Sequence, residues 1–265
     1  MNNTDVKIAL IGMGRFGQFW AQHIARHFPV YCFDKNKNRL QEAEAYAIPD
    51  SLENCLQKHY VFLTLPIHVI PDFLKSNRKK LQAGTVIIDC ASVKEIILEW
   101  FRLYIPPDVS YAASHPLFGP DSAQGGLKGH AVALIPGRIP FNHYHFLVEL
   151  FKKKLELTVL NMTAAEHDRM MAYNLSLMHH IGRTFDRMKI SCIPLLMSNL
   201  QKIKNMTEII MRDTDELFED FYNLNQYADE IRDDFISHFQ NIGDRLKENE
   251  KDKGKKARGF HQSAD

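Results

Sequence analysis

Residues 6–34 read VKIALIGMGRFGQFWAQHIARHFPVYCFD. An apolar, β-branched run leads into three glycines spaced G-x-G-x-x-G, and a stretch with the apolar periodicity of an amphipathic helix follows them. A second short apolar run then ends at Asp34. A lone glycine motif predicts little, but strand, glycine turn, helix, strand and acid in this order predict a β-α-β unit that binds a dinucleotide.

The glycine turn, Gly12-Met13-Gly14-Arg15-Phe16-Gly17, is the predicted cofactor-binding segment. Gly12 permits the tight turn, Gly14 has no Cβ to keep a pyrophosphate away, and Gly17 lets the helix pack closely on the strand. The N-terminus of the helix then faces the phosphates with free N–H groups and the positive end of its dipole.

Asp34 decides the expected cofactor. A carboxylate at this place accepts hydrogen bonds from the ribose hydroxyls and repels a 2′-phosphate, so we expect NAD. The cations that follow, Lys35, Lys37 and Arg39, could tolerate a phosphate, which makes NADP the second choice. Lys35 is included among the predicted cofactor-binding residues.

The composition narrows the function class. The chain has 265 residues and a formal net charge of +1, which gives no field for steering onto nucleic acid or an anionic membrane. No apolar stretch is long enough to cross a bilayer. The four cysteines lie far apart, without the spacing of a metal site or a disulfide framework, so we expect no metal. Together with the lack of a signal-peptide pattern at the N-terminus, this predicts a cytoplasmic protein that acts on a small molecule.

The pattern along the chain predicts an α/β fold, with an N-terminal Rossmann-type parallel-sheet domain followed by an all-helical one. After residue 160 the strand signal stops and apolar residues recur at helical spacing, beginning with a capping box of Thr163 and Glu166. The expected domains are 1–162, 163–246 and a charged, disordered tail at 247–265. The expected strands are Val6 to Ile11, Val30 to Phe33, Val61 to Leu65, Val86 to Asp89, Val109 to Ala112, Ala131 to Ile135 and Leu157 to Leu160.

Ligands of open parallel sheets sit beyond the carboxyl ends of the strands, so the residues after each strand are candidates for the site. Leu65 and Pro66 follow one strand and are expected to line the nicotinamide pocket. Ser92 and Lys94 follow the next, which would place a hydroxyl and an ammonium at the mouth of the cleft. His115 is expected in a loop held by prolines and a glycine, where an imidazole suits removal of a hydroxyl proton.

Taken together, these motifs resemble the prephenate and arogenate dehydrogenase family of tyrosine biosynthesis. The matching segments are the glycine turn with Asp34, then Asp89-Cys90-Ala91-Ser92-Val93-Lys94, His115-Pro116-Leu117-Phe118-Gly119-Pro120-Asp121-Ser122, Glu166-His167-Asp168 and the helix that carries His179. Their order covers residues 7 to 183, and the loop that begins at His115 is the most specific segment.

The resemblance implies an NAD-binding domain, a helical domain that forms a homodimer, and an active site in the cleft between the two. It implies oxidation of the ring hydroxyl of prephenate, with arogenate as the alternative, and loss of CO₂. His115 would draw off the hydroxyl proton, and Ser92 would orient either that hydroxyl or His115. Lys94 would support the polar network, and His179 would lie near the substrate.

A substrate with carboxylates also needs cations, and the fork of an arginine suits a carboxylate best. Arg183 and Arg212 are the candidates for this role. The family's usual glycine-phenylalanine-arginine-aspartate motif is absent, so Arg212 has an alternative interpretation as an exposed arginine paired with Asp215 or Glu216.

Two other functions remain open from the sequence. One is a different two-domain dehydrogenase that acts on a small hydroxy acid or an imine, which would share the glycine turn but not the loop at His115. The other is a catalytically silent NAD-binding protein, against which the presence of Ser92, His115 and His179 argues.

Overall fold

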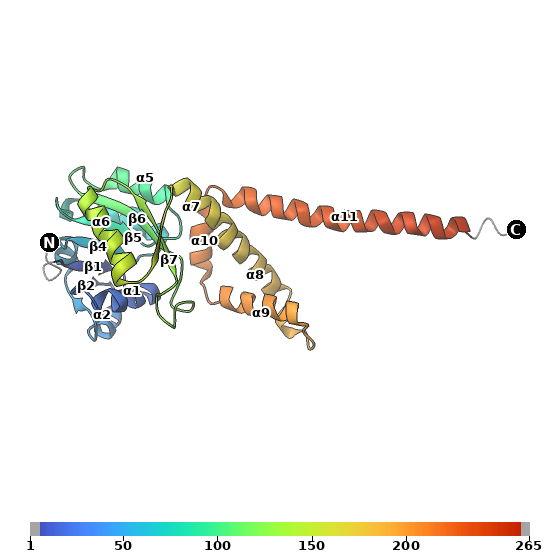
Figure 1. Ribbon diagram of the computed structural model, residues 1–265, viewed down its shortest axis with the longest axis horizontal. Helices are drawn as coiled ribbons and strands as arrows, with labels where there is room; N and C mark the ends of the chain where they lie inside the picture. The colour runs from blue at the N-terminus through green and yellow to red at the C-terminus, as the bar shows by residue number, and fades with distance from the viewer. Residues whose placement is uncertain (1–5, 261–265) are drawn as a thin grey trace. The chain divides into compact units, whose positions relative to one another are not determined.

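The computed structural model describes residues 6–260, with the side chains of residue 191 and residues 248–260 excepted. An eight-stranded sheet in the order β3-β2-β1-β4-β5-β6-β7-β8 lies in the N-terminal part of the chain (Figure 1). The strands are β1 (Ile8–Ile11), β2 (Val30–Phe33), β3 (Ile48–Pro49), β4 (Tyr60–Leu63), β5 (Val86–Asp89), β6 (Ser110–Pro116), β7 (Ala131–Pro136) and β8 (Thr158–Asn161).

The predicted Rossmann-type fold class is confirmed, with two differences in detail. The two-residue strand β3 was not predicted, because a segment this short carries no periodic pattern. The pair β6–β7 is antiparallel, whereas every other pair in the sheet is parallel. This pairing holds β6 in extended conformation as far as Pro116, past the predicted end at Ala112.

Helices of the first part follow the strands in the expected alternation. They are α1 (Arg15–Ala25), α2 (Lys37–Ala43), α3 (Leu52–Leu56), η1 (Ile67–Val69), α4 (Ile70–Asn77), η2 (Arg78–Lys80), α5 (Glu95–Tyr104), α6 (Phe141–Glu149), η3 (Leu150–Lys154) and α7 (Ala164–Met171). The predicted capping box is present: the N–H of Thr163 donates to the Glu166 carboxylate at 2.8 Å, and the N–H of Glu166 donates to Oγ1 of Thr163 at 3.2 Å.

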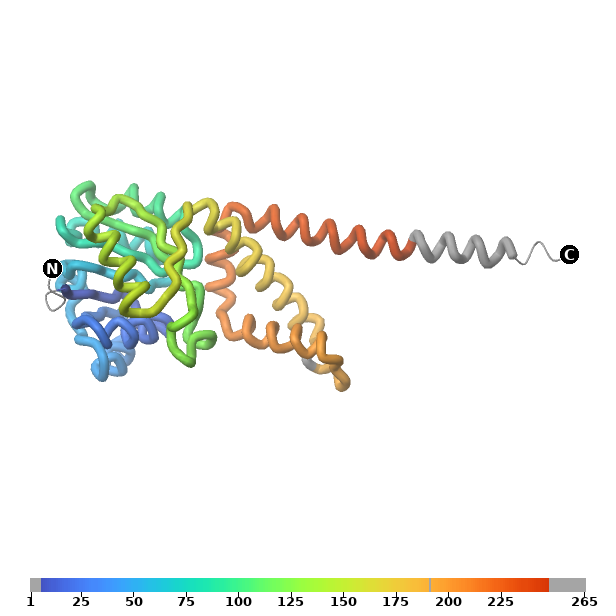
Figure 2. Tube along the Cα trace, in the orientation of Figure 1, coloured from blue at the N-terminus to red at the C-terminus, as the bar shows by residue number. Residues whose placement is uncertain are grey.

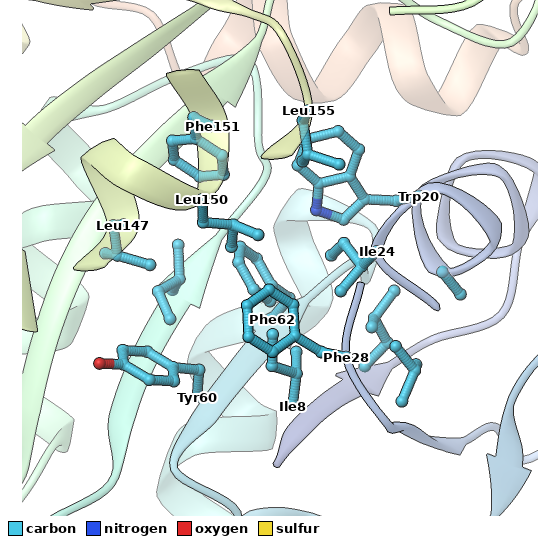
Figure 3. Close-up of a cluster of buried hydrophobic side chains, with 14 of the residues drawn as sticks. Ile8, Trp20, Ile24, Phe28, Tyr60, Phe62, Leu147, Leu150, Phe151 and Leu155 are labelled. Atoms are coloured by element: carbon cyan, nitrogen blue, oxygen red, sulfur yellow. The ribbon is translucent and has the colours of Figure 1, made fainter. Parts of the chain in front are cut away.

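The main core lies between the sheet and the segments α1, α6 and η3 (Figure 3). Trp20 of α1 is fully buried, and its ring lies 6.3 Å from that of Phe62 in β4 and 6.1 Å from that of Phe151 in η3. Because a buried aromatic side chain contributes roughly 1.5–3 kcal/mol through its apolar area, these three rings fix α1 on the sheet.

Contacts within the chain divide it into two compact units. The first runs to Met171 and also contains Asp213–Asn225, and within it α10 (Asp215–Asn223) contacts η1. Figure 2 follows the chain through both units by its colour. The second contains η4 (Ala172–Leu177), α8 (Met178–Arg187), η5 (Ile190–Cys192), α9 (Ser198–Ile210) and α11 (Ala228–Phe260). The predicted boundary after residue 162 stays a prediction.

Inside the second unit, α8 and α9 meet closely at Gly182. A Cβ at Gly182 would lie 2.5 Å from Cδ1 of Ile210, so any other residue at this position would displace the Ile210 side chain. The sequence predicts a disordered tail from residue 247, whereas helix α11 continues to Phe260. Lysine and glutamate, which are frequent in this segment, have a high intrinsic preference for helix that does not depend on packing. Residues 261–265 of that predicted tail lie outside the described residues. Among the helices of residues 6–260, none is long and apolar enough to span a membrane.

Glycine is required at position 17 for the packing of α1 on the glycine turn. A Cβ there would lie 2.0 Å from the carbonyl oxygen of Gly12, while a Cβ at Gly14 would meet no atom within 4 Å. We expect Gly17→Ala to lower the free energy of unfolding by about 1–3 kcal/mol in a denaturant titration. Gly14→Ala is the matched control, because both changes restrict the unfolded chain equally. Equal stability of the two variants would contradict this packing.

Candidate active site

The glycine turn has the geometry that a dinucleotide requires. Gly12 adopts φ +102°, and a Cβ there would lie 2.7 Å from the carbonyl oxygen of Thr64, so the turn approaches β4 closely. Gly14, the N-cap of α1, faces open space, which leaves its backbone accessible to a phosphate. The predicted roles of the three glycines therefore fit the structure.

Asp34 lies at the end of β2 and is bonded to the glycine turn. Its carboxylate accepts hydrogen bonds from the N–H groups of Met13 at 2.6 Å and of Asn36 at 2.7 Å, and Arg39 lies 3.6 Å away. Each carboxylate oxygen keeps a further lone pair for a ribose hydroxyl. The ion pair places a guanidinium next to the acid that is expected to select NAD.

A second contact joins the glycine turn to the segment after β6. Arg15, the first residue of α1, forms an ion pair of 2.8 Å with Asp121. The predicted loop residues Leu65 and Pro66 directly follow β4, with Pro66 as the N-cap of η1. The turn, the end of β4 and the segment after β6 thus gather at the carboxyl end of the sheet, as expected for a cofactor site.

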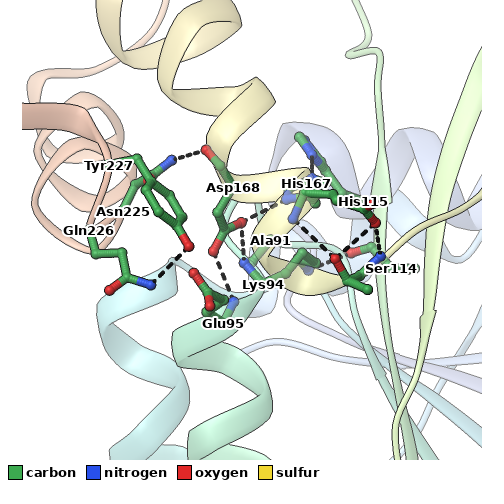
Figure 4. Close-up of polar contacts among 12 residues, drawn as sticks. Ala91, Lys94, Glu95, Ser114, His115, His167, Asp168, Asn225, Gln226 and Tyr227 are labelled. Atoms are coloured by element: carbon green, nitrogen blue, oxygen red, sulfur yellow. Dashed lines mark hydrogen bonds and ion pairs between the residues drawn. The ribbon is translucent and has the colours of Figure 1, made fainter. Parts of the chain in front are cut away.

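A buried ion pair lies beside this edge (Figure 4). The ammonium of Lys94 is fully buried and donates hydrogen bonds to the Asp89 carboxylate and, at 2.7 Å, to the carbonyl oxygen of Ser114. Asp89 also accepts from the N–H groups of Ala91 at 2.9 Å and Ser114 at 3.1 Å. The expectation that Lys94 presents its charge at the mouth of the cleft is wrong, because its ammonium is enclosed by these partners.

His115 lies in a strand, not in the predicted loop. It belongs to β6 and pairs with Ala133 of β7, so the sheet itself fixes its backbone. Its Nδ1 lies 2.9 Å from Nε2 of His167, whose Nδ1 lies 2.7 Å from Oδ1 of Asp168. Burial lowers the pKa of His115 well below its ordinary value, and His167 and the positive charge of Lys94 lower it further. His115 is therefore a neutral imidazole near neutral pH.

His115, His167 and Asp168 form a row of hydrogen-bonded side chains, the histidine row, and Asp168 connects this row to the main chain at the start of α5. Its carboxylate accepts from the N–H of Lys94 at 2.8 Å and from the N–H of Glu95 at 2.9 Å, which caps the N-terminus of α5. The side chain of Asn225 donates to the carbonyl oxygen of Asp168 at 2.8 Å. No individual role is predicted from the sequence for Asp89, His167 or Asp168, although Asp89 lies at the end of a strand and all three belong to segments that carry the family resemblance.

Ser92 has a buried hydroxyl without a hydrogen-bond partner among residues 6–260. A buried polar atom is rarely left unpaired, so this hydroxyl is suited to a ligand atom. The unpaired hydroxyl and the open space at Gly14 both fit a bound dinucleotide and its substrate.

The remaining predicted residues, His179, Arg183 and Arg212, lie in the second unit. His179 of α8 is buried, and its burial, together with the nearby charge of Arg183, lowers its pKa to about 4. Arg212 follows the end of α9. No group of three or more histidine, cysteine or acidic residues in the described part of the chain has the arrangement of a metal site.

Comparisons with known proteins place the chain in a family. Residues 21–153 match the family described as "Prephenate dehydrogenase, nucleotide-binding domain". The chain is 22% identical over 237 residues to arogenate dehydrogenase 1, chloroplastic, of Arabidopsis thaliana, with 85% of this chain and 37% of that protein covered. It is 24% identical over 266 residues to a probable arogenate/prephenate dehydrogenase of Methanocaldococcus jannaschii, with 95% and 59% covered. The chain thus spans between 37% and 64% of the length of the curated relatives it matches.

Solved structures show the same fold. Prephenate dehydrogenase from A. aeolicus, in complex with hydroxyphenyl propionate and NAD+, has a TM-score of 0.73 at 17% identity and covers 100% of both chains. Synechocystis arogenate dehydrogenase has a TM-score of 0.68 at 19% identity, with 92% of this chain and 93% of that chain covered. The match over residues 21–153 takes in half of the sequence, and it confirms both the predicted resemblance and the nucleotide-binding domain: the chain belongs to the prephenate dehydrogenase family.

Proposed function

We propose that the protein is an NAD-dependent dehydrogenase that converts prephenate to 4-hydroxyphenylpyruvate and CO₂, with arogenate as the alternative substrate. The observation that carries this proposal is His115, a neutral imidazole fixed in β6 at the carboxyl end of the sheet. Its Nε2 has no hydrogen-bond partner among the described residues. A base in this state is what removal of a hydroxyl proton requires.

For the expected reaction, the side chains have to position the substrate and remove the proton of its ring hydroxyl. NAD, when bound, accepts the hydride. Loss of hydride builds positive charge at the carbinol carbon, and a hydrogen bond from the substrate hydroxyl to Nε2 of His115 strengthens as that charge develops. Ser92 would orient the same hydroxyl, and aromatisation of the ring with loss of CO₂ supplies the driving force. His179, Arg183 and Arg212 are proposed to contact the substrate, the two arginines through its carboxylates.

The proposal can be tested with His115→Asn. With NAD and either prephenate or arogenate, the wild-type protein is expected to produce NADH, measured by its absorbance. The variant should lose about 10²–10⁴-fold in kcat, the usual contribution of a general base, while NAD still binds in a calorimetric titration. A wild-type protein that is inactive on both substrates would refute the proposed function, and a fully active variant would refute the role of His115.

The cofactor preference is proposed to depend on Asp34. Asp34→Ser removes the negative charge that disfavours a 2′-phosphate and leaves Arg39 without its ion-pair partner. We expect the ratio of the NAD and NADP dissociation constants to shift toward NADP by at least about tenfold, since each 1.4 kcal/mol changes affinity tenfold. Lys154→Ser, at an exposed position of η3, is the control. An unchanged ratio in Asp34→Ser would mean that another group reads the ribose.

We also propose that the protein forms a homodimer through its second unit. Helix α11 exposes an apolar stripe at helical spacing, in which Phe239 is 70%, Ile242 55% and Leu246 58% exposed, and Phe235 and Ile236 extend it. An exposed stripe of this kind marks a surface for association. Its continuity along one helix favours a second copy of the same helix as the partner.

The stripe predicts the effect of Phe239→Asp on association. We expect sedimentation velocity to show a dimer for the wild-type chain and a monomer for the variant, because the new carboxylate would be buried without a partner. Asn241→Asp adds the same charge on the other side of α11 and should leave the dimer intact. A wild-type monomer, or a dimeric Phe239→Asp protein, would contradict this proposal.

A further inference from the structure

The row from Asp168 through His167 to His115 fixes the position of every proton along it (Figure 4). The Asp168 carboxylate receives two main-chain N–H groups, from Lys94 and Glu95, and is therefore an acceptor. Nδ1 of His167, 2.7 Å from Oδ1 of Asp168, must then carry the proton of that hydrogen bond. In a neutral imidazole the other nitrogen is an acceptor, so Nε2 of His167 has a lone pair.

The same reasoning continues to His115. Its Nδ1 lies 2.9 Å from the lone pair on Nε2 of His167 and must donate to it. Nε2 of His115 is then unprotonated and ready to accept a proton. Without His167, either nitrogen of His115 could carry the proton, and the tautomer with a proton on Nε2 cannot act as the base.

The charges around the row favour the same arrangement. His115 faces His167 and Lys94, while His167 faces Asp168, Lys94 and Asp89. Asp89 balances the charge of Lys94 directly, at hydrogen-bonding contact. Asp168 is thus the acidic group whose charge reaches His115 through His167, and its side chain and that of His167 are at most 2% exposed, so the effect is not screened by water.

We propose that His167, held by Asp168, is a positioning residue that keeps His115 in the tautomer with its proton on Nδ1. The inference rests on the proposed dehydrogenase function. The proton of the substrate hydroxyl goes to Nε2 of His115, and the proton on Nδ1 of His115 shifts toward Nε2 of His167. The Nδ1 proton of His167 stays on its hydrogen bond to Asp168. NAD, when bound, would accept the hydride from the carbon that carries the substrate hydroxyl.

The tautomer can be measured without any turnover. Long-range ¹H–¹⁵N correlation spectra of the histidine rings distinguish the two neutral tautomers, and the His115→Asn spectrum identifies the signals of His115 among those of the 13 histidines. We expect His115 with its proton on Nδ1 in the wild-type protein. A proton on Nε2 of His115 would overturn the proposal, whatever substrate the protein uses.

Two substitutions of His167 separate positioning from a purely structural role. In His167→Gln the amide oxygen can still accept from Nδ1 of His115, whereas in His167→Phe a ring of similar size has no acceptor. We expect His167→Phe to lower kcat by about 10²-fold, because a catalytic histidine in the wrong tautomer is largely inactive. His167→Gln should recover most of that loss, with KM and the NAD dissociation constant unchanged in both.

The control is His143→Phe in α6, which removes a 2.9 Å contact between His143 and the Tyr60 hydroxyl in the same unit. It should leave kcat unchanged. Equal losses of kcat in the Gln and Phe variants of His167, or a fully active Phe variant, would overturn the proposal. An inactive wild-type protein with His115 in the expected tautomer would instead refute the proposed function and leave the hydrogen-bond assignment standing.

Discussion

The buried ion pair of Asp89 and Lys94 is the interaction on which the arrangement of the site depends. Asp89 ends β5, Lys94 precedes α5, and the Ser114 carbonyl that completes the coordination of the ammonium lies in β6. Leaving either charge without its partner typically costs about 3–5 kcal/mol, so these three elements must be placed together. The pair therefore sets the distance between the end of one strand and the start of the helix that follows it.

The position of the histidine row depends on the buried ion pair of Asp89 and Lys94. The main chain at Lys94 donates to Asp168, and Asp168 in turn holds His167. His115, the residue after Ser114, receives its position from the same strand that meets the Lys94 ammonium. The backbone of His115 is fixed in the sheet, and its Nδ1 is held by His167. The direction of its other ring nitrogen, Nε2, is therefore set before any ligand binds.

Features that depend on neighbours in the sequence could be predicted, and those that depend on distant segments could not. The glycine turn with Asp34 lies within a single β-α-β unit, and the capping box of Thr163 and Glu166 lies within four residues. Both are present in the structure as the sequence predicts. The contact between His115 and His167 joins residues 52 apart, so no local pattern contains it. His115 was expected in a loop because the antiparallel partner β7 cannot be seen from β6 alone. The burial of Lys94 likewise depends on Ser114, which lies in another strand.

The central claim is that a half-buried, neutral His115 takes the substrate proton, and the pH dependence of kcat/KM tests it most directly. Burial, His167 and Lys94 hold the pKa of His115 well below its ordinary value of about 6.5. Burial also lowers the pKa of His167, although Asp168 and Asp89 act in the opposite direction. Since the neutral form is the active one, activity falls only when the pH drops through this lowered pKa. We expect kcat/KM, measured with saturating NAD, to stay at its plateau through pH 6.5 and to fall only well below it. A profile that is half-maximal near pH 6.5, and loses that limb in His115→Asn, would contradict the account.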